Sequence, residues 1–346
     1  MDPAIVKVLM ITPFTSAQRG NSLTTARLQR FLNRRGFQID RISLENRHWP
    51  ELVAQALAQT RYNLIHGFHA LHFGRVLATV PSLRRLPMIL TTTGTDIHYD
   101  LVGPQQELVL EAMRAVQKIV VFNEDFRRDL QTRYPEWGDK IVTIPQGVFL
   151  ETNVLKNRGE LGLAPEDFVF LLPSGLRPVK NIELAIEAMT EVHRAYPRLR
   201  LLIIGPVIDA EYGLPLLEKM RGLDWIIYLG EVPHQEMDGL LALGDVVLNT
   251  SHSEGQPQAA LEAMSLGKPC ILTAVSGNLN LMDPGKQGYY VRNRQELVAA
   301  ALDLLTQPAL CAEMGHNARR LVETRFGLSE ELEAYSRLYL EYADLP

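Results

Sequence analysis

Short runs of consecutive apolar residues alternate along this chain with segments in which apolar residues recur three or four positions apart. The first run is IVKVLMIT at 5–12, and Leu28, Phe31 and Leu32 then repeat at helical spacing before Gly36. An apolar run of this length is typical of a strand buried on both faces, whereas the wider spacing is typical of an amphipathic helix. The pattern therefore predicts a strand and then a helix that ends near Gly36.

The same alternation continues to residue 148. Predicted strands follow at 37–44, 62–68, 87–93, 118–122 and 140–145, and predicted helices at 50–59 and 105–116. Continuous apolar strands that alternate with helices favour a parallel sheet covered on both faces.

The pattern lapses at 149–167, where Asn, Lys, Arg, Gly and Pro are mixed, and we interpret this stretch as an interdomain linker. Beyond it we predict strands at 168–174, 200–205, 225–230, 245–251 and 268–273, helices at 181–197, 214–220, 235–244 and 257–267, and three closing helical segments. The predicted fold is α/β, with two doubly wound Rossmann-like domains facing each other across a cleft. They comprise residues 1–150, completed by the C-terminal helix 329–346, and residues 151–328. Ligands of such sheets bind beyond the carboxyl ends of the strands.

Length and charge narrow the function classes. A chain of 346 residues is too long for one average core, which agrees with two domains. Its net charge of −5 gives no general attraction for nucleic acid, so none is expected as a partner, and a phosphate ligand needs local cations. No apolar run approaches the roughly 20 residues that span a bilayer. We expect a cytoplasmic protein in which Cys270 and Cys311 are buried free thiols. The oligomeric state stays open.

The loop SGLRPVKN at 174–181 is a candidate anion site. Gly175 permits a tight turn, and Arg177 and Lys180 are three apart, so both can reach one side of the loop. Arginine binds phosphate oxygens through a two-pronged fork and lysine acts as a point charge. Two solvated charges at a helix start are the alternative. Cations there are disfavoured by the helix dipole unless an anion lies between them.

The stretch SEGQPQAALEAMSLGKP at 253–269 places two carboxylates around a helix start. Backbone N–H groups after Gly255 would favour a phosphate or sugar oxygen. Glu262 can accept two hydrogen bonds from a vicinal diol such as a ribose, and Glu254 could accept from sugar hydroxyls. The alternative makes Glu254 a partner of the helix dipole and Glu262 a surface residue. The small and apolar neighbours of Glu262 favour burial instead, where an unpaired carboxylate would be costly.

These motifs together resemble a known family. GLRPVKN followed by EGQPQAALEAM and GKP strongly resembles the retaining nucleotide-sugar glycosyltransferases of family 4, which have the two-domain GT-B fold. The hallmark of that family is two glutamates separated by seven residues, as Glu254 and Glu262 are. The strand ends at Gly205 and Gly230 agree, and the resemblance covers nearly all of 165–325.

The resemblance implies a role for each matching residue. Arg177 and Lys180 would bind the diphosphate of the sugar nucleotide, Glu262 its ribose and Glu254 the transferred sugar. The motif and strand-end positions that would contact the same ligand are Gly175, Gly205, Gly255, Gln256 and Pro257.

The N-terminal half carries a weaker resemblance. RGNSLTTARL occupies the place of the family's acceptor and phosphate loop, and Gly20 fits that loop's glycine. TTTGTDIHYD resembles the family's Thr-x-His-Gly-Thr-Asp segment, with Thr93 in place of the histidine. We expect Thr93 to line the sugar end of the cleft and Asp96 to accept from a sugar or acceptor hydroxyl. The alternative is that Asp96 caps the next turn.

GN-x-x-TTA together with GTD also resembles a short subgroup that includes the vertebrate glycosyltransferase 1 domain-containing proteins and the bacterial selenosugar synthases. That subgroup suggests a small acceptor and does not identify it.

Two other patterns are weaker indications of function. Three histidines lie three apart, at His66, His69 and His72, but without a nearby carboxylate they make a poor metal site, and we interpret them as loop or cleft residues. No Asp-x-Asp occurs, so neither a metal nor a separate cofactor is expected. A basic helix face, most simply a solvated one, is formed by Arg27, Arg30, Arg34 and Arg35. Membrane contact through it is the minority alternative.

The sequence therefore favours a metal-independent retaining glycosyltransferase. Its co-substrate would be a nucleoside-diphosphate sugar, and Arg177, Lys180, Glu254 and Asp96 would carry the chemistry with an unidentified acceptor. A nucleotide-sugar epimerase or hydrolase on the same fold, or a non-catalytic sugar-nucleotide-binding protein, are the alternatives.

Overall fold

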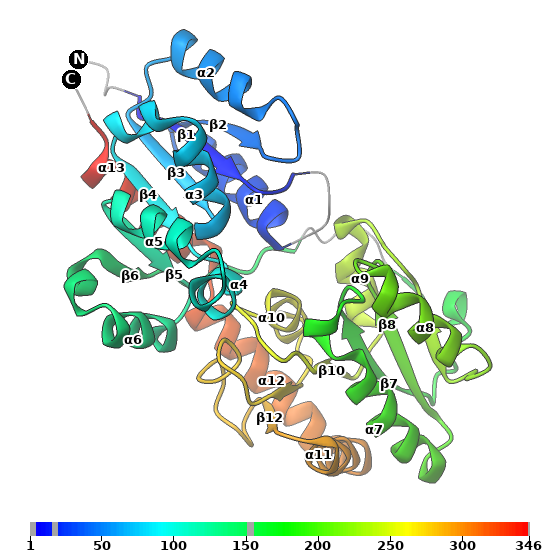
Figure 1. Ribbon diagram of the computed structural model, residues 1–346. Coiled ribbons are helices and arrows are strands. Elements are labelled where there is room, and N and C mark those ends of the chain that lie inside the picture. Colours follow the sequence, from blue (N-terminus) through cyan, green and yellow to red (C-terminus); the bar gives the residue numbers. More distant parts are fainter. Residues whose placement is uncertain (1–4, 16–19, 151–155, 345–346) are drawn as a thin grey trace. The chain divides into compact units, whose positions relative to one another are not determined.

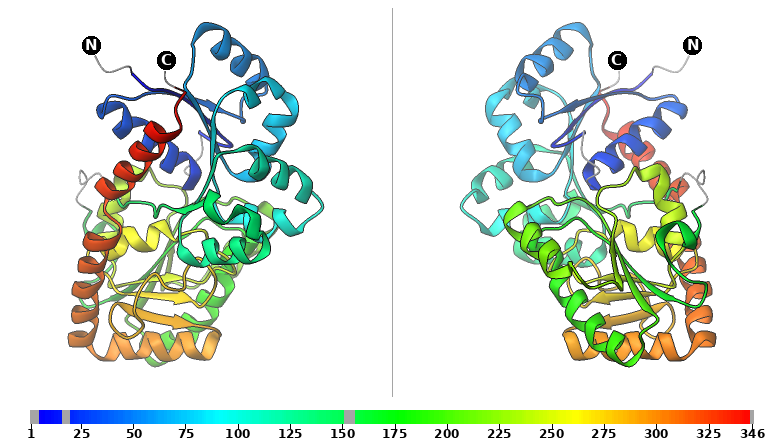
Figure 2. Two further views of the ribbon diagram at one scale, coloured as in Figure 1. Left: turned by 90° about the vertical axis from the view of Figure 1, so that its left-hand side faces the viewer. Right: turned by 90° about the vertical axis from the view of Figure 1, so that its right-hand side faces the viewer.

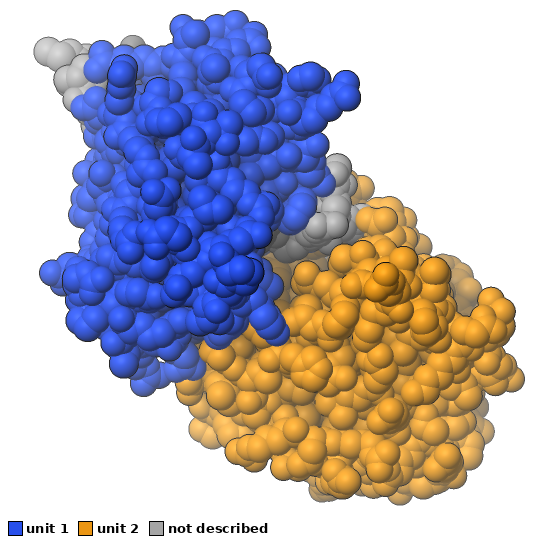
Figure 3. Space-filling model, viewed as in Figure 1, with its two compact units in different colours: residues 1–147, 328–346 blue, residues 148–327 orange. Residues whose placement is uncertain are grey.

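The computed structural model describes residues 5–15, 20–150 and 156–344 (Figure 1). The chain forms two compact units, coloured separately in Figure 3. Unit 1 comprises residues 1–147 and 328–346, and unit 2 comprises residues 148–327. The chain leaves unit 1 after Gly147, three residues before the predicted boundary, and returns at Leu328. Unit 1 is thus discontinuous in sequence.

Unit 1 is built on a six-stranded sheet in the order β2-β1-β3-β4-β5-β6, with every neighbouring pair parallel. The strands are β1 (Lys7–Thr12), β2 (Gln38–Ser43), β3 (Leu64–Phe68), β4 (Met88–Thr91), β5 (Lys118–Val121) and β6 (Ile141–Thr143). The strand order reverses between β1 and β3, so the carboxyl ends of these two strands flank the topological switch point.

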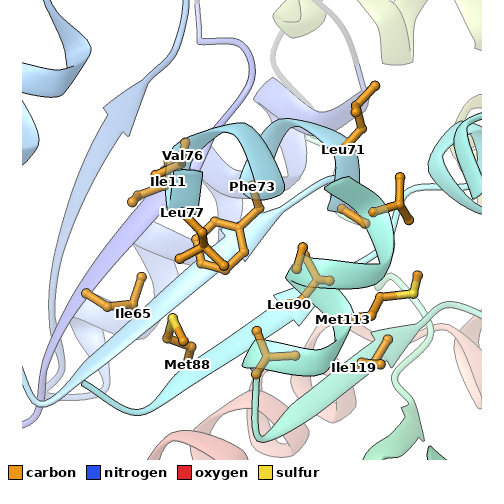
Figure 4. Close-up of a cluster of buried hydrophobic side chains, with 14 of the residues drawn as sticks. Ile11, Ile65, Leu71, Phe73, Val76, Leu77, Met88, Leu90, Met113 and Ile119 are labelled. Carbon is orange, nitrogen blue, oxygen red and sulfur yellow. The ribbon is translucent and has the colours of Figure 1, made fainter. Parts of the chain in front are cut away.

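Helices cover both faces of this sheet. One face carries α2 (Trp49–Gln59), α3 (Ala70–Thr79), α5 (Gln106–Ala115) and α6 (Glu124–Arg133), and the other α1 (Gly20–Arg34) and α13 (Leu328–Tyr342). Figure 4 shows part of the first core, in which Phe73 and Leu77 of α3 lie over Ile65 and Leu90 of the sheet. The alternation of apolar strands with amphipathic helices thus produces the predicted parallel sheet, which helices cover on both faces.

The C-terminal helix α13 is an integral part of unit 1. It lies beside α1 in both views of Figure 2. Tyr335 and Tyr339 of this helix are fully buried, and Arg27 of α1 forms a buried ion pair with Glu331 at 2.9 Å. Arg27 therefore does not belong to a solvated basic face, and the predicted face is reduced to the remaining arginines.

Unit 2 repeats the plan with a parallel sheet in the order β12-β11-β10-β7-β8-β9. Its strands are β7 (Phe168–Pro173), β8 (Leu199–Ile204), β9 (Ile226–Tyr228), β10 (Val246–Asn249), β11 (Cys270–Thr273) and β12 (Gly288–Val291). The strand order reverses between β7 and β10, which are paired at the centre of the sheet.

The helices of unit 2 also form two layers. The helices packed on one face are α7 (Ile182–Ala195), α8 (Ala210–Met220) and α11 (Arg294–Thr306), and those on the other are α9 (Met237–Ala242) and α10 (Gln258–Ser265). The long helix α12 (Pro308–Arg325) contributes side chains to both cores.

Four α-helices and strands were not predicted, and one prediction was too broad. The sequence did not indicate α3, the short α4 (Thr95–His98), α6 or β12. Part of the predicted linker 149–167 belongs to unit 2, because Leu163 is buried in its core and the guanidinium of Arg158 donates to Leu243 O and to Asp245. The mixed polar composition concealed these anchors.

Cys270 and Cys311 are both buried free thiols, as predicted. Burial raises the pKa of the Cys311 thiol to about 11. Over the described ranges, no single helix is both long and apolar enough to cross a bilayer. The pair α11 and α12 meets that test only when taken together, and it is bent by 103° between the two helices.

Candidate functional site

The candidate site of unit 2 lies at the carboxyl ends of its two central strands. β7 leads into the loop with Arg177 and Lys180, and β10 leads into the loop with Glu254. Because β7 and β10 are parallel neighbours, both loops emerge at the same edge of the sheet. This edge is also the topological switch point, where doubly wound sheets bind their ligands.

Lys180 and Glu254 meet directly at this edge. The Nζ of Lys180 donates to Glu254 Oε1 at 2.6 Å, and the same oxygen accepts from Ser251 Oγ at 2.7 Å and from Asn249 Nδ2 at 2.8 Å. The side chain of Glu254 is only 9% exposed. Burial raises the pKa of Glu254, but the charge of Lys180 and these hydrogen bonds outweigh burial and leave the pKa below its usual value. The carboxylate is therefore ionised at neutral pH.

Close backbone packing shapes the Arg177 loop. Arg177 is half-buried and precedes a 3-10 turn, Pro178–Lys180. Gly205, which follows β8, has a φ of +151°, and a Cβ there would lie 2.4 Å from the carbonyl oxygen of Ser174. Gly205 therefore lets the loops after β7 and β8 approach each other. Gly175 does not have a left-handed conformation, and a Cβ there would lie 2.5 Å from Cδ1 at the end of the exposed Ile208 side chain.

Glu262 lies inside α10 and is only 5% exposed, which rules out the alternative of a surface residue. Its Oε1 is 3.3 Å from Nε2 of His234, in the short turn His234–Glu236 between β9 and α9. The sequence did not indicate His234, because it lies 28 positions before Glu262 in a different element, and no spacing signal links them. The predicted ribose-binding carboxylate thus has a histidine partner.

Three buried residues follow Glu254. Gly255, Gln256 and Pro257 lead into α10, which begins one residue later than predicted. The carbonyl oxygen of Pro257 accepts the N–H groups of Ala260 and Leu261, so Pro257 caps the helix. Their contact with a ligand stays a prediction.

Asp96 of unit 1 does not have the role that we expected. It is fully buried in α4 (Thr95–His98), and its carboxylate accepts backbone N–H groups of Ala70, Thr93 and Gly94 at 2.8–3.2 Å. These bonds join the loops after β3 and β4, so the carboxylate is already engaged and not presented to a sugar. Asp96 is a positioning residue, as in the capping alternative. Thr93 is half-buried beside it, and its contact with a sugar is untested.

The three histidines in and after β3 do not converge on one point. His66 is fully buried within β3, where Nδ1 lies 2.6 Å from Tyr339 Oη and Nε2 lies 2.7 Å from Thr91 Oγ1. This position corrects its interpretation as a loop or cleft residue. His69 has a φ of +66°, a strained conformation for a side-chain-bearing residue, and its ring meets His72 edge-on.

Gly20 is the first residue of α1, and the loop before it, 16–19, lies outside the described residues. Its predicted role is therefore not tested. A cavity of about 650 Å³ in unit 1 lies beside β2, next to Arg41 and Glu45, and does not include Thr93 or Asp96.

Comparison with known families finds a match for the segment that contains this site. Residues 153–321 match the family described as Glycosyl transferases group 1. The matched segment is 169 of the 346 residues and lies within unit 2. It contains every unit 2 residue that we placed at the candidate site.

Relatives resemble the chain over most of its length. It is 26% identical over 335 residues to glycosyltransferase 1 domain-containing protein 1 of Xenopus tropicalis, covering 94% of this chain and 95% of that protein. It is also 26% identical over 294 residues to N-acetyl-alpha-D-glucosaminyl L-malate synthase of Bacillus anthracis, covering 84% of this chain and 70% of that protein.

Solved structures resemble the chain over nearly its whole length. Sucrose-phosphate synthase from Thermosynechococcus elongatus aligns with a TM-score of 0.82 at 19% identity, covering 97% of this chain and 98% of that one. Anabaena HepE in complex with UDP-glucose aligns with a TM-score of 0.80 at 17% identity, covering 97% and 100%. The chain therefore has the predicted GT-B fold.

Proposed function

We propose that the protein is a retaining, metal-independent glycosyltransferase that moves a sugar from a nucleoside-diphosphate sugar to a small acceptor. The observation that carries the proposal is the meeting of Lys180 with Glu254 at the switch point of unit 2, within the segment that matches the group 1 family. The ammonium group of Lys180 would meet the diphosphate, and the carboxylate of Glu254 beside it would meet the sugar that is joined to that diphosphate. Names of relatives that pair a sugar with L-malate or with D-inositol 3-phosphate support the small acceptor.

The proposed chemistry is departure of the nucleoside diphosphate from the anomeric carbon. Negative charge then grows on the diphosphate, and Arg177 and Lys180 stabilise it because their charges are already in place and partly removed from water. Glu254 would accept a hydroxyl of the departing sugar, and Glu262 would accept the ribose hydroxyls. Retention would follow from attack on the same face, with the diphosphate helping to remove the acceptor's proton.

A screen of nucleotide sugars tests this proposal. Thermal-shift measurements against uridine, guanosine and adenosine diphosphate sugars should identify at least one that stabilises the protein, because a ligand that binds only the folded state raises its melting temperature. Turnover with that sugar nucleotide is then measured over a panel of small polyols and hydroxy acids. Failure of every nucleotide sugar and nucleoside diphosphate to bind would refute the proposal.

The same assay separates the alternatives. Without acceptor, a transferase leaves the sugar nucleotide mostly intact, whereas an epimerase or hydrolase converts it. Tight binding without turnover over the whole acceptor panel would indicate a non-catalytic binding protein.

The metal requirement is tested by adding EDTA. The described residues contain no cluster of three or more His, Cys, Asp or Glu side chains that could hold a metal. Full turnover in EDTA is expected. Loss of turnover that magnesium or manganese restores would contradict the metal-independent mechanism.

A further inference from the structure

Two asparagine side chains connect Glu254 to the loop that follows β11. Asn249, the last residue of β10, donates from Nδ2 to Glu254 Oε1 at 2.8 Å. Its Oδ1 accepts from the Ser251 N–H at 3.2 Å and from Asn278 Nδ2 at 3.3 Å. A rotated amide would place its carbonyl oxygen against the carboxylate and its NH₂ against two donors. The orientation of Asn249 is therefore fixed by its neighbours.

Asn278 is itself held firmly. It is fully buried, and its Nδ2 also donates to Thr273 O at 2.9 Å. The preceding residue, Gly277, has a φ of +91°, and a Cβ there would lie 2.0 Å from the carbonyl oxygen of Glu254. The loop after β11 thus contacts Glu254 twice, through Gly277 at its backbone and through the amides at its side chain.

The hydrogen bonds to Glu254 are unevenly distributed between its two oxygens. Lys180, Ser251 and Asn249 all donate to Oε1. Within the part of the chain that the structure describes, no hydrogen bond is made to Oε2. Donors on one oxygen fix the rotation of the carboxylate and leave the other oxygen with its full capacity to accept.

We propose that Asn249, fixed by Asn278, is a positioning residue that orients Glu254 so that Oε2 accepts a hydroxyl of the transferred sugar. This inference rests on the proposed function and adds two residues to its site. A free nucleoside diphosphate lacks the transferred sugar. The amide pair should therefore affect sugar transfer and leave diphosphate binding unchanged.

Two substitutions of Asn249 test the inference. Asn249→Leu removes the amide at similar volume, whereas Asn249→Asp keeps the shape and the acceptor atom but puts a like charge beside Glu254. Each should lower kcat about tenfold or more, since one charge-assisted hydrogen bond is lost, while the affinity for the free diphosphate stays within about twofold. A role in shape alone would spare Asn249→Asp.

Matched variants separate positioning from stability. Asn293→Ala removes another asparagine of unit 2 whose side chain accepts a backbone N–H, at the start of α11 and away from this cluster. It should lower the melting temperature and leave kcat unchanged. Asn278→Leu should also lower kcat. If Asn249→Leu does not fold, Asn278→Leu takes its place in the comparison.

The outcomes distinguish this inference from the proposed function. Wild-type kcat in the folded Asn249 variants, with kcat lost in Glu254→Gln, would overturn the positioning role and leave the glycosyltransferase intact. A parallel loss of diphosphate affinity and kcat would overturn it as well. Absence of any nucleotide-sugar binding by the wild type would overturn both.

Discussion

Lys180 Nζ lies 2.6 Å from Glu254 Oε1, so two side chains that the sequence assigned to different parts of a ligand form one ion pair. The two residues are 74 positions apart in the sequence, and their loops follow the paired central strands of one sheet. A diphosphate and its sugar would therefore meet a connected group of charges. Loss of Lys180 would leave the largely buried Glu254 without its cation.

Removal of either cation should weaken binding of nucleoside diphosphates. We expect Arg177→Ala and Lys180→Ala each to cost roughly 1.5–3 kcal/mol of binding free energy, because each removes a charge-assisted phosphate contact. Calorimetry with the free diphosphate measures this cost. Lys180→Ala should also lower the melting temperature, since Glu254 loses its cation. The exposed Lys219 of α8 provides the control, and unchanged affinity in both variants would contradict the assignment.

The two glutamates should have separable effects. Glu262→Gln should weaken the free diphosphate and the sugar nucleotide alike, because the ribose is common to both. Glu254→Gln should spare the free diphosphate and mainly reduce sugar-nucleotide binding or turnover. Paired calorimetric titrations of each variant check this, and the reverse pattern would mean that the two roles are exchanged.

His234 should act through Glu262. His234→Ala is expected to reduce the preference for ribose over 2′-deoxyribose diphosphates, because Glu262 loses the partner 3.3 Å from its Oε1. His234→Gln retains a donor and should restore part of that preference. The exposed His316 of α12, changed to Gln, is the matched control. An unaltered ratio of the two affinities in His234→Ala would show that His234 does not position Glu262.

Asp96 should behave as a structural carboxylate. Asp96→Asn replaces an acceptor by an NH₂ group that faces backbone N–H donors, and we expect a loss of roughly 1.5–3 kcal/mol in the free energy of unfolding. Chemical denaturation measures the loss, with the exposed Asp129→Asn as the control. Wild-type stability combined with reduced turnover would instead support the sugar contact that we first predicted.

Unit 1 should lose stability in mild acid because of His66. Burial lowers the pKa of His66 to about 3, against about 6.5 in an unfolded chain. The unfolded state therefore binds a proton first, so this contribution is complete above about pH 6.5 and is lost as the pH falls towards the folded value. Within that window each pH unit costs about 1.4 kcal/mol.

Urea unfolding of the wild type and His66→Asn at several pH values tests that linkage. The variant should be less stable at neutral pH and show a smaller decline below about pH 6.5. The exposed His316→Gln serves as the control and should keep the wild-type slope. Equal slopes for wild type and His66→Asn would contradict the linkage.

The sequence predicted most of the fold because both sheets are parallel and buried, so their strands appear as continuous apolar runs. The missed helix α3 has a physical cause. His69 alone makes the turn from β3 into α3 with a positive φ, and neither Gly nor Pro marks the boundary. The missed helix α6 buries only Phe126 and Leu130, which gives it little apolar periodicity.

The site was predicted unevenly for a related reason. Arg177, Lys180, Glu254 and Glu262 lie in two short motifs whose spacing is local. His234 contacts Glu262, and Asn278 contacts Asn249, only after the strands pair, so no spacing in the chain links these residues. Asn249 lies only five residues before Glu254, but no motif marked it. The role of Asp96 depended in the same way on the distant backbone N–H of Ala70.

The discontinuity of unit 1 determines the order in which the two units can be completed during synthesis. Unit 2 lies wholly within 148–327, whereas unit 1 lacks α13, one of the two helices that cover one face of its sheet, until residues 328–342 have left the ribosome. His66 and Thr91 remain without their tyrosine partners in the meantime. The half of the protein that is translated first is therefore the last to reach its native core. Until α13 packs, part of one apolar face of its sheet stays uncovered and prone to aggregation.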